Sequence, residues 1–564
     1  DESNGIEQLE SIDDKGFQEE LMGIVGNADS DSLLNEKHIL QVRDIDGWNE
    51  EEVQLKSCER PQRLRESISV LDHQKYGVVW LNGRYESQAS SRGALLADDM
   101  GLGKTLQVLV FLLLRRERME HEGIKLKPDL IVAPVVLLDN WLDEMEKFFS
   151  QLPNFLTLHG NVIHSLRQPG CGYGQEYRGK PRVTLDIEPI QSAEVVLTTY
   201  ETVRDYQYSL GQVEWATIVA DEAQRVKNPM TLSSLALRAM KADFRIACTA
   251  TPIENSLIDL WSISDFAVPG LLGTQKDFKE SYCNTERSNM QALRQMIRPT
   301  VLRRMKQEIL KDLPEKVERK VEIPLSSTQW ERYIDVIRSL GNGPMQSGIM
   351  LKILHRLRDI CSCLLDDEEE LSNDKILSQN SKLTQLMNIV DSIASAGEKV
   401  IVFTDRKAWQ RVIAKLIEEK YSVPVAIING DVPGVTRSKG ISRKILIDLF
   451  RGRQGFGALV LSPVAAGYGI TVTEANHVIH FSRLWNPAKE DQATDRAYRI
   501  GQEKKVQVYY LISTAPQRQM VTFDERLDEL LSKKRQLAGD VLVPSQLLEV
   551  HANDFATLFE DIEK

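Results

Sequence analysis

Residues 93–107 read GALLADDMGLGKTLQ, an apolar run followed by a glycine-rich turn and the start of an apolar helix. Backbone N–H groups in such a turn, with the positive end of the following helix, form a cradle for phosphate. The Lys104 ammonium would reach the outer phosphates, and the Thr105 hydroxyl would hold Mg²⁺. The spacing G-x-x-x-x-G-K-[ST] is not met, because Asp98 stands at the first glycine position. The candidate nucleotide-binding residues here are Asp99, Gly101, Gly103, Lys104 and Thr105.

The alternative interpretation of this stretch is a strand-to-helix turn that binds no ligand. The rest of the chain must decide between this turn and a nucleotide site. The chain has 564 residues, more than one hydrophobic core usually holds, and this length predicts two large domains with extensions. Its apolar fraction of 42% and charged fraction of 27% are typical of soluble globular proteins.

Sequence features also bear on location. No apolar run approaches the roughly 18 residues of a membrane span, and no signal-peptide pattern opens the chain. The six cysteines form no disulfide framework, and Cys361 and Cys363 have the wrong spacing for half of a zinc site. We therefore expect a cytoplasmic protein without a membrane partner. Because the chain begins at Asp1 rather than methionine, we expect a fragment of a longer protein.

Negative charge is concentrated at the beginning of the chain. Residues 1–70 contain 18 acidic and 7 basic side chains, a net charge of −11, whereas the whole chain carries −12. Residues 1–65 are therefore expected to form an acidic extension or a small helical domain, with a merely solvated acidic face as the alternative. The remaining chain is almost neutral, which leaves room for a locally basic groove that binds nucleic acid.

Strand and helix patterns alternate after the glycine-rich turn. Apolar runs that predict strands occur at residues 130–138, 195–200, 217–220 and 247–255. A helix at residues 71–81 would present Gln74, whose amide can both donate to and accept from the edge of an adenine. This alternation predicts a doubly wound parallel sheet whose ligand site lies at the carboxyl ends of its strands.

An acidic pair, Asp221 and Glu222, follows one of these predicted strands. An aspartate at a strand end can coordinate Mg²⁺ through water, and an adjacent glutamate can polarise an attacking water. Such a pair is usually surface charge, but its place about 115 residues after a phosphate loop favours catalysis.

The strand and helix pattern begins again in the second half of the chain. Apolar runs at 399–404, 425–429, 458–462 and 478–481 predict a second sheet that lacks a phosphate loop. A helix after this sheet is expected to carry Gln492, Arg496 and Arg499, with the two arginines on one face. These arginines could reach a phosphate held by the first sheet, and a solvated basic face is the alternative.

Six motifs occur in a fixed order along the chain: DDMGLGKT, DEAQ, TATPIEN, FAVPGLLG, VFTDR and QATDRAYRIGQ. Over about residues 71–513 this set resembles the Swi/Snf-like family of superfamily-two helicase-related ATPases. The resemblance implies an α/β fold of two RecA-like doubly wound parallel-sheet lobes with helical insertions. It also implies that ATP is clamped between the lobes and that double-stranded DNA lies across both.

The resemblance assigns roles to individual residues. Gln74 would read adenine, Lys104 and Thr105 would hold phosphate and Mg²⁺, and Asp221 and Glu222 would serve metal and water. Arg496 and Arg499 would be arginine fingers, with Gln492 beside them. The segments that line the family's DNA track contain Thr198, Thr199, Thr404, Arg406, Thr471 and Trp485.

Three positions depart from the family pattern. Gln224 stands where histidine is more frequent, and its amide can still link the nucleotide to the other lobe. Val464 replaces a frequent lysine and Leu484 a tryptophan, and these two changes concern contacts with DNA. The expected domains are residues 1–65, a first lobe at 66–305 that binds ATP, and a second lobe at 306–564. The second lobe would include a helical insertion at about 327–380 and a C-terminal helical extension.

The resemblance implies an ATP hydrolase that moves along double-stranded DNA or remodels protein–DNA complexes, with ATP and Mg²⁺ as cofactors. Bacterial phage-defence systems, Zorya among them, include subunits similar to this family, so partners in a multi-subunit system are expected. Three alternatives stay open: a strand-separating helicase, a remodeller that recycles RNA polymerase, and a nucleotide-gated DNA-binding module that does not hydrolyse ATP.

Overall fold

The structure is a computed structural model. It describes residues 60–87, 92–168, 184–250, 257–283, 287–309, 313–339, 347–364, 372–432, 443–463, 471–518, 520–537, 550 and 555. Almost all of the acidic segment expected at residues 1–65 lies outside these ranges, and so does Val464. The TPIEN part of the motif TATPIEN also lies outside the described residues.

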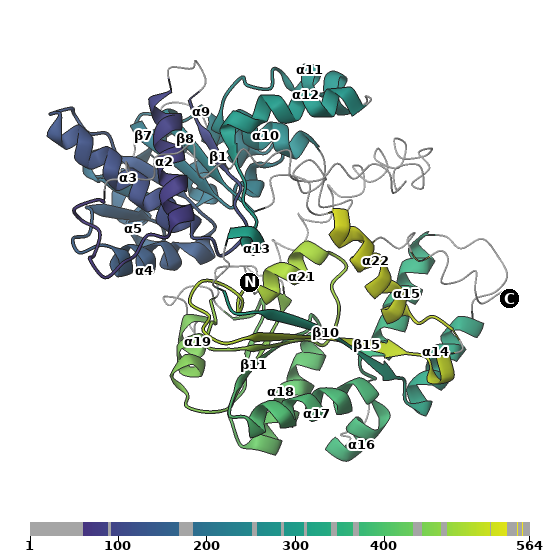
Figure 1. The fold of residues 1–564 in the computed structure, drawn as a ribbon. Coiled ribbons are helices and arrows are strands. Elements are labelled where there is room, and N and C mark those ends of the chain that lie inside the picture. Colours follow the sequence, from purple (N-terminus) through teal and green to yellow (C-terminus); the bar gives the residue numbers. More distant parts are fainter. Residues whose placement is uncertain are drawn as a thin grey trace. The chain divides into compact units, whose positions relative to one another are not determined.

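Seven parallel strands form the first sheet, in the order β3-β6-β2-β7-β8-β1-β9 (Figure 1). Its strands are β1 (Ala94–Leu96), β2 (Asp129–Val132), β3 (Phe155–Leu158), β6 (Val195–Thr198), β7 (Glu214–Asp221), β8 (Lys241–Cys248) and β9 (Val301–Leu302). The helices that enter the argument are α2 (Asp72–Glu86), α3 (Lys104–His121), α4 (Leu138–Phe148), α7 (Tyr200–Asp205) and α10 (Leu257–Ala267). Because all strands run in one direction, the loops that follow β1 and β7 lie at the same edge of the sheet.

Six parallel strands form the second sheet, in the order β10-β15-β14-β11-β13-β12. Its strands are β10 (Lys316–Pro324), β11 (Lys399–Phe403), β12 (Ala426–Ile428), β13 (Gly457–Leu461), β14 (His477–His480) and β15 (Val506–Thr514). The helices connected to it include α13 (Lys306–Ile309), α14 (Ser327–Arg338), α15 (Ser347–Ser362), α17 (Ser381–Ser395), α18 (Lys407–Tyr421), α19 (Arg443–Gly452), α21 (Pro487–Thr494) and α22 (Phe523–Leu537). Together the two sheets confirm the predicted α/β class with two parallel-sheet lobes.

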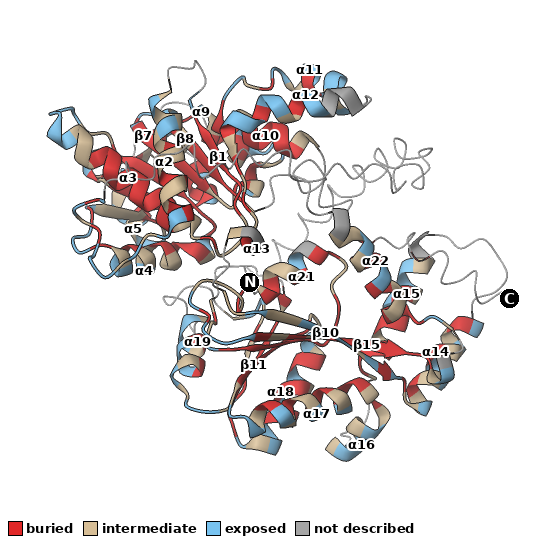
Figure 2. Ribbon diagram, viewed as in Figure 1, coloured by how far each residue is buried: buried red, intermediate tan, exposed pale blue. Residues whose placement is uncertain are grey.

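The middle of each central strand is apolar because helices cover both faces of each sheet. All five residues of β11 are buried; Val400 and Val402 pack in a cluster with α17 and α18, whereas Ile401 and Phe403 pack in a cluster with α19. Figure 2 shows buried residues along the strands of both sheets. This alternation between two cores is what a two-sided parallel sheet requires.

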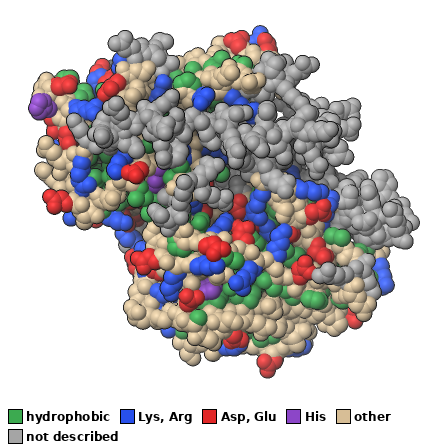
Figure 3. Space-filling view, viewed as in Figure 1, with side chains coloured by type: hydrophobic (Ala, Val, Ile, Leu, Met, Phe, Trp, Pro, Cys, Tyr) green, Lys and Arg blue, Asp and Glu red, His purple; other side chains and the backbone are tan. Residues whose placement is uncertain are grey.

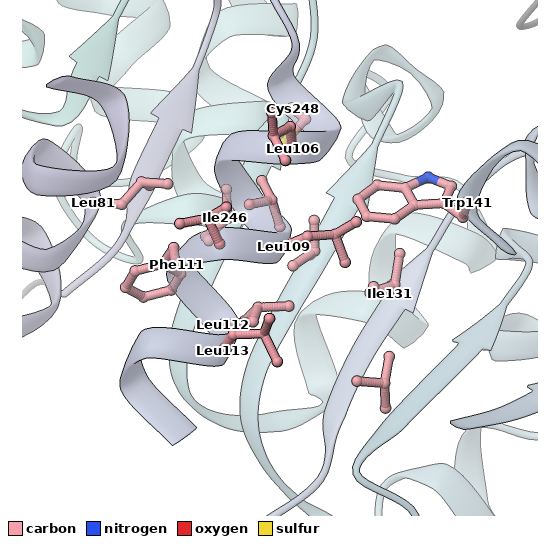
Figure 4. Packing of buried hydrophobic residues seen from close by; sticks show 14 of the residues in the cluster. Leu81, Leu106, Leu109, Phe111, Leu112, Leu113, Ile131, Trp141, Ile246 and Cys248 are labelled. Atoms are coloured by element: carbon pink, nitrogen blue, oxygen red, sulfur yellow. The ribbon is translucent and has the colours of Figure 1, made fainter. Parts of the chain in front are cut away.

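Helix α3 anchors the glycine-rich turn to the first core. Leu106, Leu109 and Leu113 are buried against β2, β8 and α4, as Figure 4 shows. Full burial of one such side chain stabilises the fold by about 1.5–3 kcal/mol. The first residues of α3 are therefore held firmly on the sheet, and this also fixes the position of the turn that precedes them.

Several boundaries differ from the sequence-based expectation. The run at 195–200 is not all strand, because Thr199 caps a helix that begins at Tyr200, with its hydroxyl accepting from the Thr202 N–H. The run at 130–138 leaves β2 at Val132, and a short 3-10 turn follows Pro134. Strands β3, β9, β10 and β15 were not predicted. Within the described residues, no helix is both long enough and apolar enough to cross a membrane.

Candidate nucleotide site

Glycines shape the turn between β1 and α3. Gly101 and Gly103 have φ values of 83° and 80°, in the left-handed region that residues with a Cβ rarely adopt. Gly103 is the N-cap of α3, so the free N–H groups of the first helical turn face the loop. The Lys104 ammonium lies back across this loop and donates to the carbonyl oxygens of Asp98 at 2.6 Å and Asp99 at 3.2 Å. The turn therefore has the backbone conformation that a phosphate cradle needs.

A buried ion pair lies below the loop, at the residue that breaks the glycine spacing. The Asp98 side chain is fully buried, and its Oδ1 accepts from Arg304 Nε at 2.9 Å while its Oδ2 accepts from Arg304 Nη2. Arg304 also donates to Gln107 Oε1 at 2.8 Å and to the carbonyl oxygen of His73. Arg304 was not among the predicted site residues. Its bidentate pairing explains why an aspartate can replace the first glycine.

Gln74 contacts the loop rather than solvent. Its Nε2 donates to the Leu102 carbonyl oxygen at 3.3 Å, and its Oε1 accepts from the Leu71 N–H at 3.0 Å. A Cβ on Gly103 would lie 2.4 Å from Gln74 Nε2, so another residue there would displace the Gln74 amide besides straining the backbone. The side chain predicted to read adenine is thus adjacent to the phosphate loop.

The acidic pair lies at the end of β7, where Asp221 is the last residue of the strand. Asp221 Oδ2 accepts from the Trp141 indole N–H at 2.9 Å, and its Oδ1 accepts from the Glu222 N–H at 3.0 Å. Glu222 has a φ of 51°, a left-handed conformation that is strained for a non-glycine residue and is frequent at functional sites. Gln224 links this pair to β8, because its Nε2 donates to Glu222 Oε2 at 2.7 Å and its Oε1 accepts from Thr249 Oγ1 at 2.7 Å.

Removal from water and the neighbouring Glu222 raise the pKa of Asp221 to about 7. Its hydrogen bonds from Trp141 and Glu222 come from uncharged donors, and the charge of Lys104 offsets only part of the cost of burying the carboxylate. A buried carboxylate whose charge is only partly offset is suited to a cationic ligand.

Glu144 on α4 was not predicted as a site residue. Burial raises its pKa, and the hydroxyl of Thr105 and the amide of Asn140 bond to its carboxyl group. The Arg499 guanidinium acts on the same carboxyl in the opposite direction. Thr105, the predicted metal-binding hydroxyl, therefore has a carboxyl neighbour that also faces the second lobe. No short motif around Glu144 marked it in the sequence.

The two predicted arginines are not on one helical face, which corrects the sequence-based expectation. Helix α21 carries the partly buried Gln492 but ends at Thr494, and the residues after it form turns. The Arg496 N–H donates to the Ala493 carbonyl oxygen three residues back, and the Arg496 carbonyl oxygen accepts from the Val472 N–H at 2.8 Å. The Arg496 carbonyl oxygen pairs with this distant segment instead of with a later helical N–H, so the turns do not continue as a helix.

These turns nevertheless bring both arginines to the phosphate loop. Arg496 Nη2 lies 4.0 Å from the Met100 sulfur, and a Cβ on Gly101 would lie 3.0 Å from the Cβ of Arg499. Arg499 Nη1 also donates to Thr471 Oγ1 at 2.6 Å. Burial lowers the pKa of Arg496 to about 10. A buried guanidinium group and a partly buried one beside this loop are suited to bind a polyanion.

The remaining predicted DNA-track residues have intramolecular contacts. The Thr198 hydroxyl donates to the Leu158 carbonyl oxygen at 2.9 Å, and Thr404 shares a hydrogen bond of 3.3 Å with Ser482. Thr199 caps α7. Arg406 pairs with Asp359 at 2.6 Å and is partly exposed. Trp485 packs on Phe523 and Phe555, with ring centroids 6.1 and 5.5 Å away.

Fold and site together define a two-lobed α/β protein in which one lobe holds a phosphate loop and the other contributes arginines to it. The SNF2-related domain matches residues 73–390, and the helicase conserved C-terminal domain matches residues 381–501. The first match spans more than half of the chain. The chain belongs to the SNF2-related family.

Two curated bacterial relatives are similar over most of this chain. Zorya protein ZorD of Escherichia coli O139:H28 is 42% identical over 509 residues, which are 86% of this chain and 46% of the relative. The putative ATP-dependent helicase/translocase YwqA of Bacillus subtilis is 35% identical over 503 residues, 86% of this chain and 50% of the relative. The chain spans about half the length of these relatives.

One solved structure that is similar to this chain is the Sulfolobus solfataricus SWI2/SNF2 ATPase core in complex with dsDNA. It is 31% identical, with a TM-score of 0.40, and the match covers 89% of this chain and 98% of that one.

Proposed function

We propose that this chain is the motor of an ATP-dependent double-stranded DNA translocase, which couples hydrolysis to movement along DNA or to remodelling of protein–DNA complexes. The main observation that supports this proposal is that Arg496 and Arg499 of the second lobe lie at the loop that contains Lys104 in the first lobe. A site completed by two lobes lets hydrolysis depend on how the lobes meet.

In this proposal each residue has one task. Lys104 would leave its backbone carbonyl partners and bind the outer phosphates, and Gln74 would bind the base. Glu222 would orient and polarise the attacking water, and its strained backbone supports this role because such strain is retained where geometry matters. Arg496 and Arg499 would neutralise charge on the transferred phosphoryl group, while Gln224 and Gln492 would sense the nucleotide.

The donor set at this site fits Mg²⁺ bound together with a nucleotide. Asp221 supplies a carboxylate without a cationic hydrogen-bond partner, and Thr105 supplies a hydroxyl at the start of α3. Magnesium in nucleotide sites usually takes only one or two protein ligands and relies on phosphate oxygens and water for the rest. When bound, the ion would neutralise phosphate charge, so Asp221 and Thr105 are the two residues proposed to hold it.

The proposed lobes are residues 66–305 and 306–564, with a helical insertion at about 327–380 and a C-terminal helical extension. The change of sheet between β9 and β10 supports a boundary near residue 306. Double-stranded DNA is the proposed partner, and the proposed track contains Thr198, Thr199, Thr404, Arg406, Thr471 and Trp485. A place in a multi-subunit antiviral system is also proposed, and the similarity to Zorya protein ZorD supports it. The proposed location is the cytoplasm.

Parallel ATPase assays test the substrate. Turnover is measured without nucleic acid and with single-stranded DNA, duplex DNA or RNA, at two salt concentrations. We expect duplex DNA to stimulate most, and the stimulation to fall with salt because the track contacts phosphates. Equal or stronger stimulation by single strands or RNA would contradict the duplex proposal. Absence of ATP turnover under every condition would favour the nucleotide-gated binding module.

A displacement assay separates translocation from strand separation. The motor is expected to remove a triplex-forming third strand while it leaves the duplex intact. Efficient unwinding of a forked duplex in the same buffer would instead support the helicase alternative.

A further inference from the structure

One lysine contacts both the phosphate loop and the arginine-bearing turns. Lys306 follows β9 of the first sheet and begins α13. Its backbone N–H donates to Asp99 Oδ2 in the loop at 3.3 Å. Its ammonium is buried, and it pairs with Asp495 Oδ1 at 2.7 Å and donates to the Tyr498 carbonyl oxygen at 2.6 Å. The backbone and side chain of one residue thus join the two halves of the site.

The side of Lys306 also packs into the place where the loop and the arginines meet. A Cβ on Gly101 would lie 3.3 Å from Lys306 Cε and 3.0 Å from Arg499 Cβ. The Lys306 ammonium lies 5.2 Å from the centroid of the Tyr498 ring, within the range of a cation–π contact. Lys306 therefore has no freedom to point elsewhere while these turns stay in place.

The contacts of Lys306 fall on the residues that flank the arginines. Asp495 immediately precedes Arg496, and Tyr498 immediately precedes Arg499. Since helix α21 has ended before this point, the backbone of these turns is not held by a continuing helix. The ion pair between Lys306 and Asp495 stabilises one end of these turns, and the charge-assisted hydrogen bond from Lys306 to the Tyr498 carbonyl oxygen stabilises the other.

We propose that Lys306 is a positioning residue of the ATPase, which holds residues 495–498 against the phosphate loop and so aims Arg496 and Arg499 at the nucleotide. This inference rests on the proposed function. It assigns to Lys306 a task distinct from that of Lys104, because the ammonium of Lys306 is occupied by Asp495 and Tyr498 and acts through the arginines.

Variants of Lys306 and Asp495 test this inference, with Lys444→Met as a matched control. Lys444 pairs with Asp143 of the first lobe at 2.7 Å, but both side chains are about half exposed, so this pair should contribute little. We expect Lys306→Met and Asp495→Asn each to lower duplex-stimulated kcat by about 10- to 100-fold, with nucleotide affinity near that of the unmodified chain. Lys444→Met should leave kcat unchanged.

The double variant distinguishes positioning from general damage. If Lys306 acts through Asp495, then Lys306→Met combined with Asp495→Asn should be no slower than the slower single variant. Additive losses would show that the two residues act separately and would overturn the inference, as would an unchanged kcat in Lys306→Met. If Lys306→Met proves unfolded by its melting curve, the same decision rests on Asp495→Asn alone.

Hydrogen exchange gives a readout that needs no hydrolysis. Lys306→Met should speed amide exchange at residues 496–499 while exchange in α3 stays as in the unmodified chain. Unchanged exchange at 496–499 would overturn the inference even if kcat fell. Failure of the proposed function looks different, because the unmodified chain would then lack ATP turnover while this exchange difference persisted.

Discussion

Asp221 of the first lobe and Glu490 of the second are both withdrawn from water beside a parallel sheet, and their surroundings are opposite. Asp221 accepts hydrogen bonds from an indole and a backbone N–H, and burial raises its pKa to about 7. Glu490 is also desolvated, but the Arg483 guanidinium pairs with it at 2.8 Å and Arg535 pairs with it at 2.6 Å, so its pKa falls to about 2.

The two surroundings correspond to two roles. Asp221 is the carboxylate proposed to bind a ligand, and Glu490 is a carboxylate that stabilises the fold. Glu490 joins α21 to the segment after β14 and to α22, so its charge is balanced within the protein. The charge of Asp221 is offset only in part, by that of Lys104, and a bound cation would offset the rest. Lysine and arginine side chains lie among acidic ones on the face of the molecule shown in Figure 3, so net surface charge would not have revealed this contrast.

The largest expected effect concerns Glu222, which is next to Asp221 in the proposed catalytic pair. Glu222→Gln should lower ATP turnover by about 10²- to 10⁴-fold, because an amide cannot polarise the attacking water, while nucleotide affinity stays near normal. Turnover and affinity are measured together, with Glu214→Gln at the exposed start of β7 as the control. Full turnover by Glu222→Gln would remove that residue from the mechanism.

The variant Glu490→Gln tests whether the Glu490 carboxylate stabilises the fold. Loss of one partner leaves Arg483 buried without its full charge balance, and we expect the free energy of unfolding to fall by about 3 kcal/mol. The carboxylate form contributes stability above its ordinary pKa of 4.5, and this contribution is lost as the pH falls toward 2. Denaturant titrations at pH 7 and pH 4 measure the loss, and equal stability of variant and unmodified chain at pH 7 would break the comparison.

Lys104→Ala should weaken nucleotide binding by about 10- to 100-fold, the value of a charge-assisted hydrogen bond. The fold should be unaffected, because among the residues that the structure describes the Lys104 ammonium donates only to backbone carbonyl oxygens. Binding of a fluorescent nucleotide and a melting curve check both statements. A large drop in melting temperature would mean that Lys104, like Glu490, is a structural residue.

The smallest effect concerns stability at the first lobe. A raised pKa means that the charged form of Asp221 is disfavoured in the folded state, so its cost is present above pH 7 and disappears as the pH falls toward 4. Asp221→Asn should therefore stabilise the nucleotide-free chain by on the order of 1 kcal/mol at pH 8, and by less at pH 5. Melting curves at both pH values test this, and destabilisation at pH 8 would contradict it.

The sequence predicted the elements whose patterns are local. The glycine-rich turn, the acidic pair and the central strands of both sheets could be predicted because each has a short pattern with a direct physical cause. The edge strand β10, with exposed residues at Glu318 and Arg319, was missed because only one short stretch of it is buried. Tyr200 was assigned to a strand, since burial alone does not distinguish a strand end from a capped helix start.

The contacts that complete the site could not be predicted, because they join distant segments. Arg304 reaches Asp98 across 206 residues, and Lys306 reaches Tyr498 across 192. The spacing of Arg496 and Arg499 suits a helix, but in the structure the Arg496 carbonyl oxygen accepts from the distant Val472 N–H. Long-range pairing of this kind leaves no periodic trace in a single sequence.

The central claim is that ATP hydrolysis needs residues from both lobes, and Arg499 tests it most directly. ATPase rates of Arg499→Ala are measured with and without duplex DNA, beside Arg411→Ala, which removes an exposed arginine of α18. We predict that Arg499→Ala binds nucleotide but loses stimulation by DNA, whereas Arg411→Ala keeps both. Undiminished stimulation of Arg499→Ala would contradict the two-lobe site.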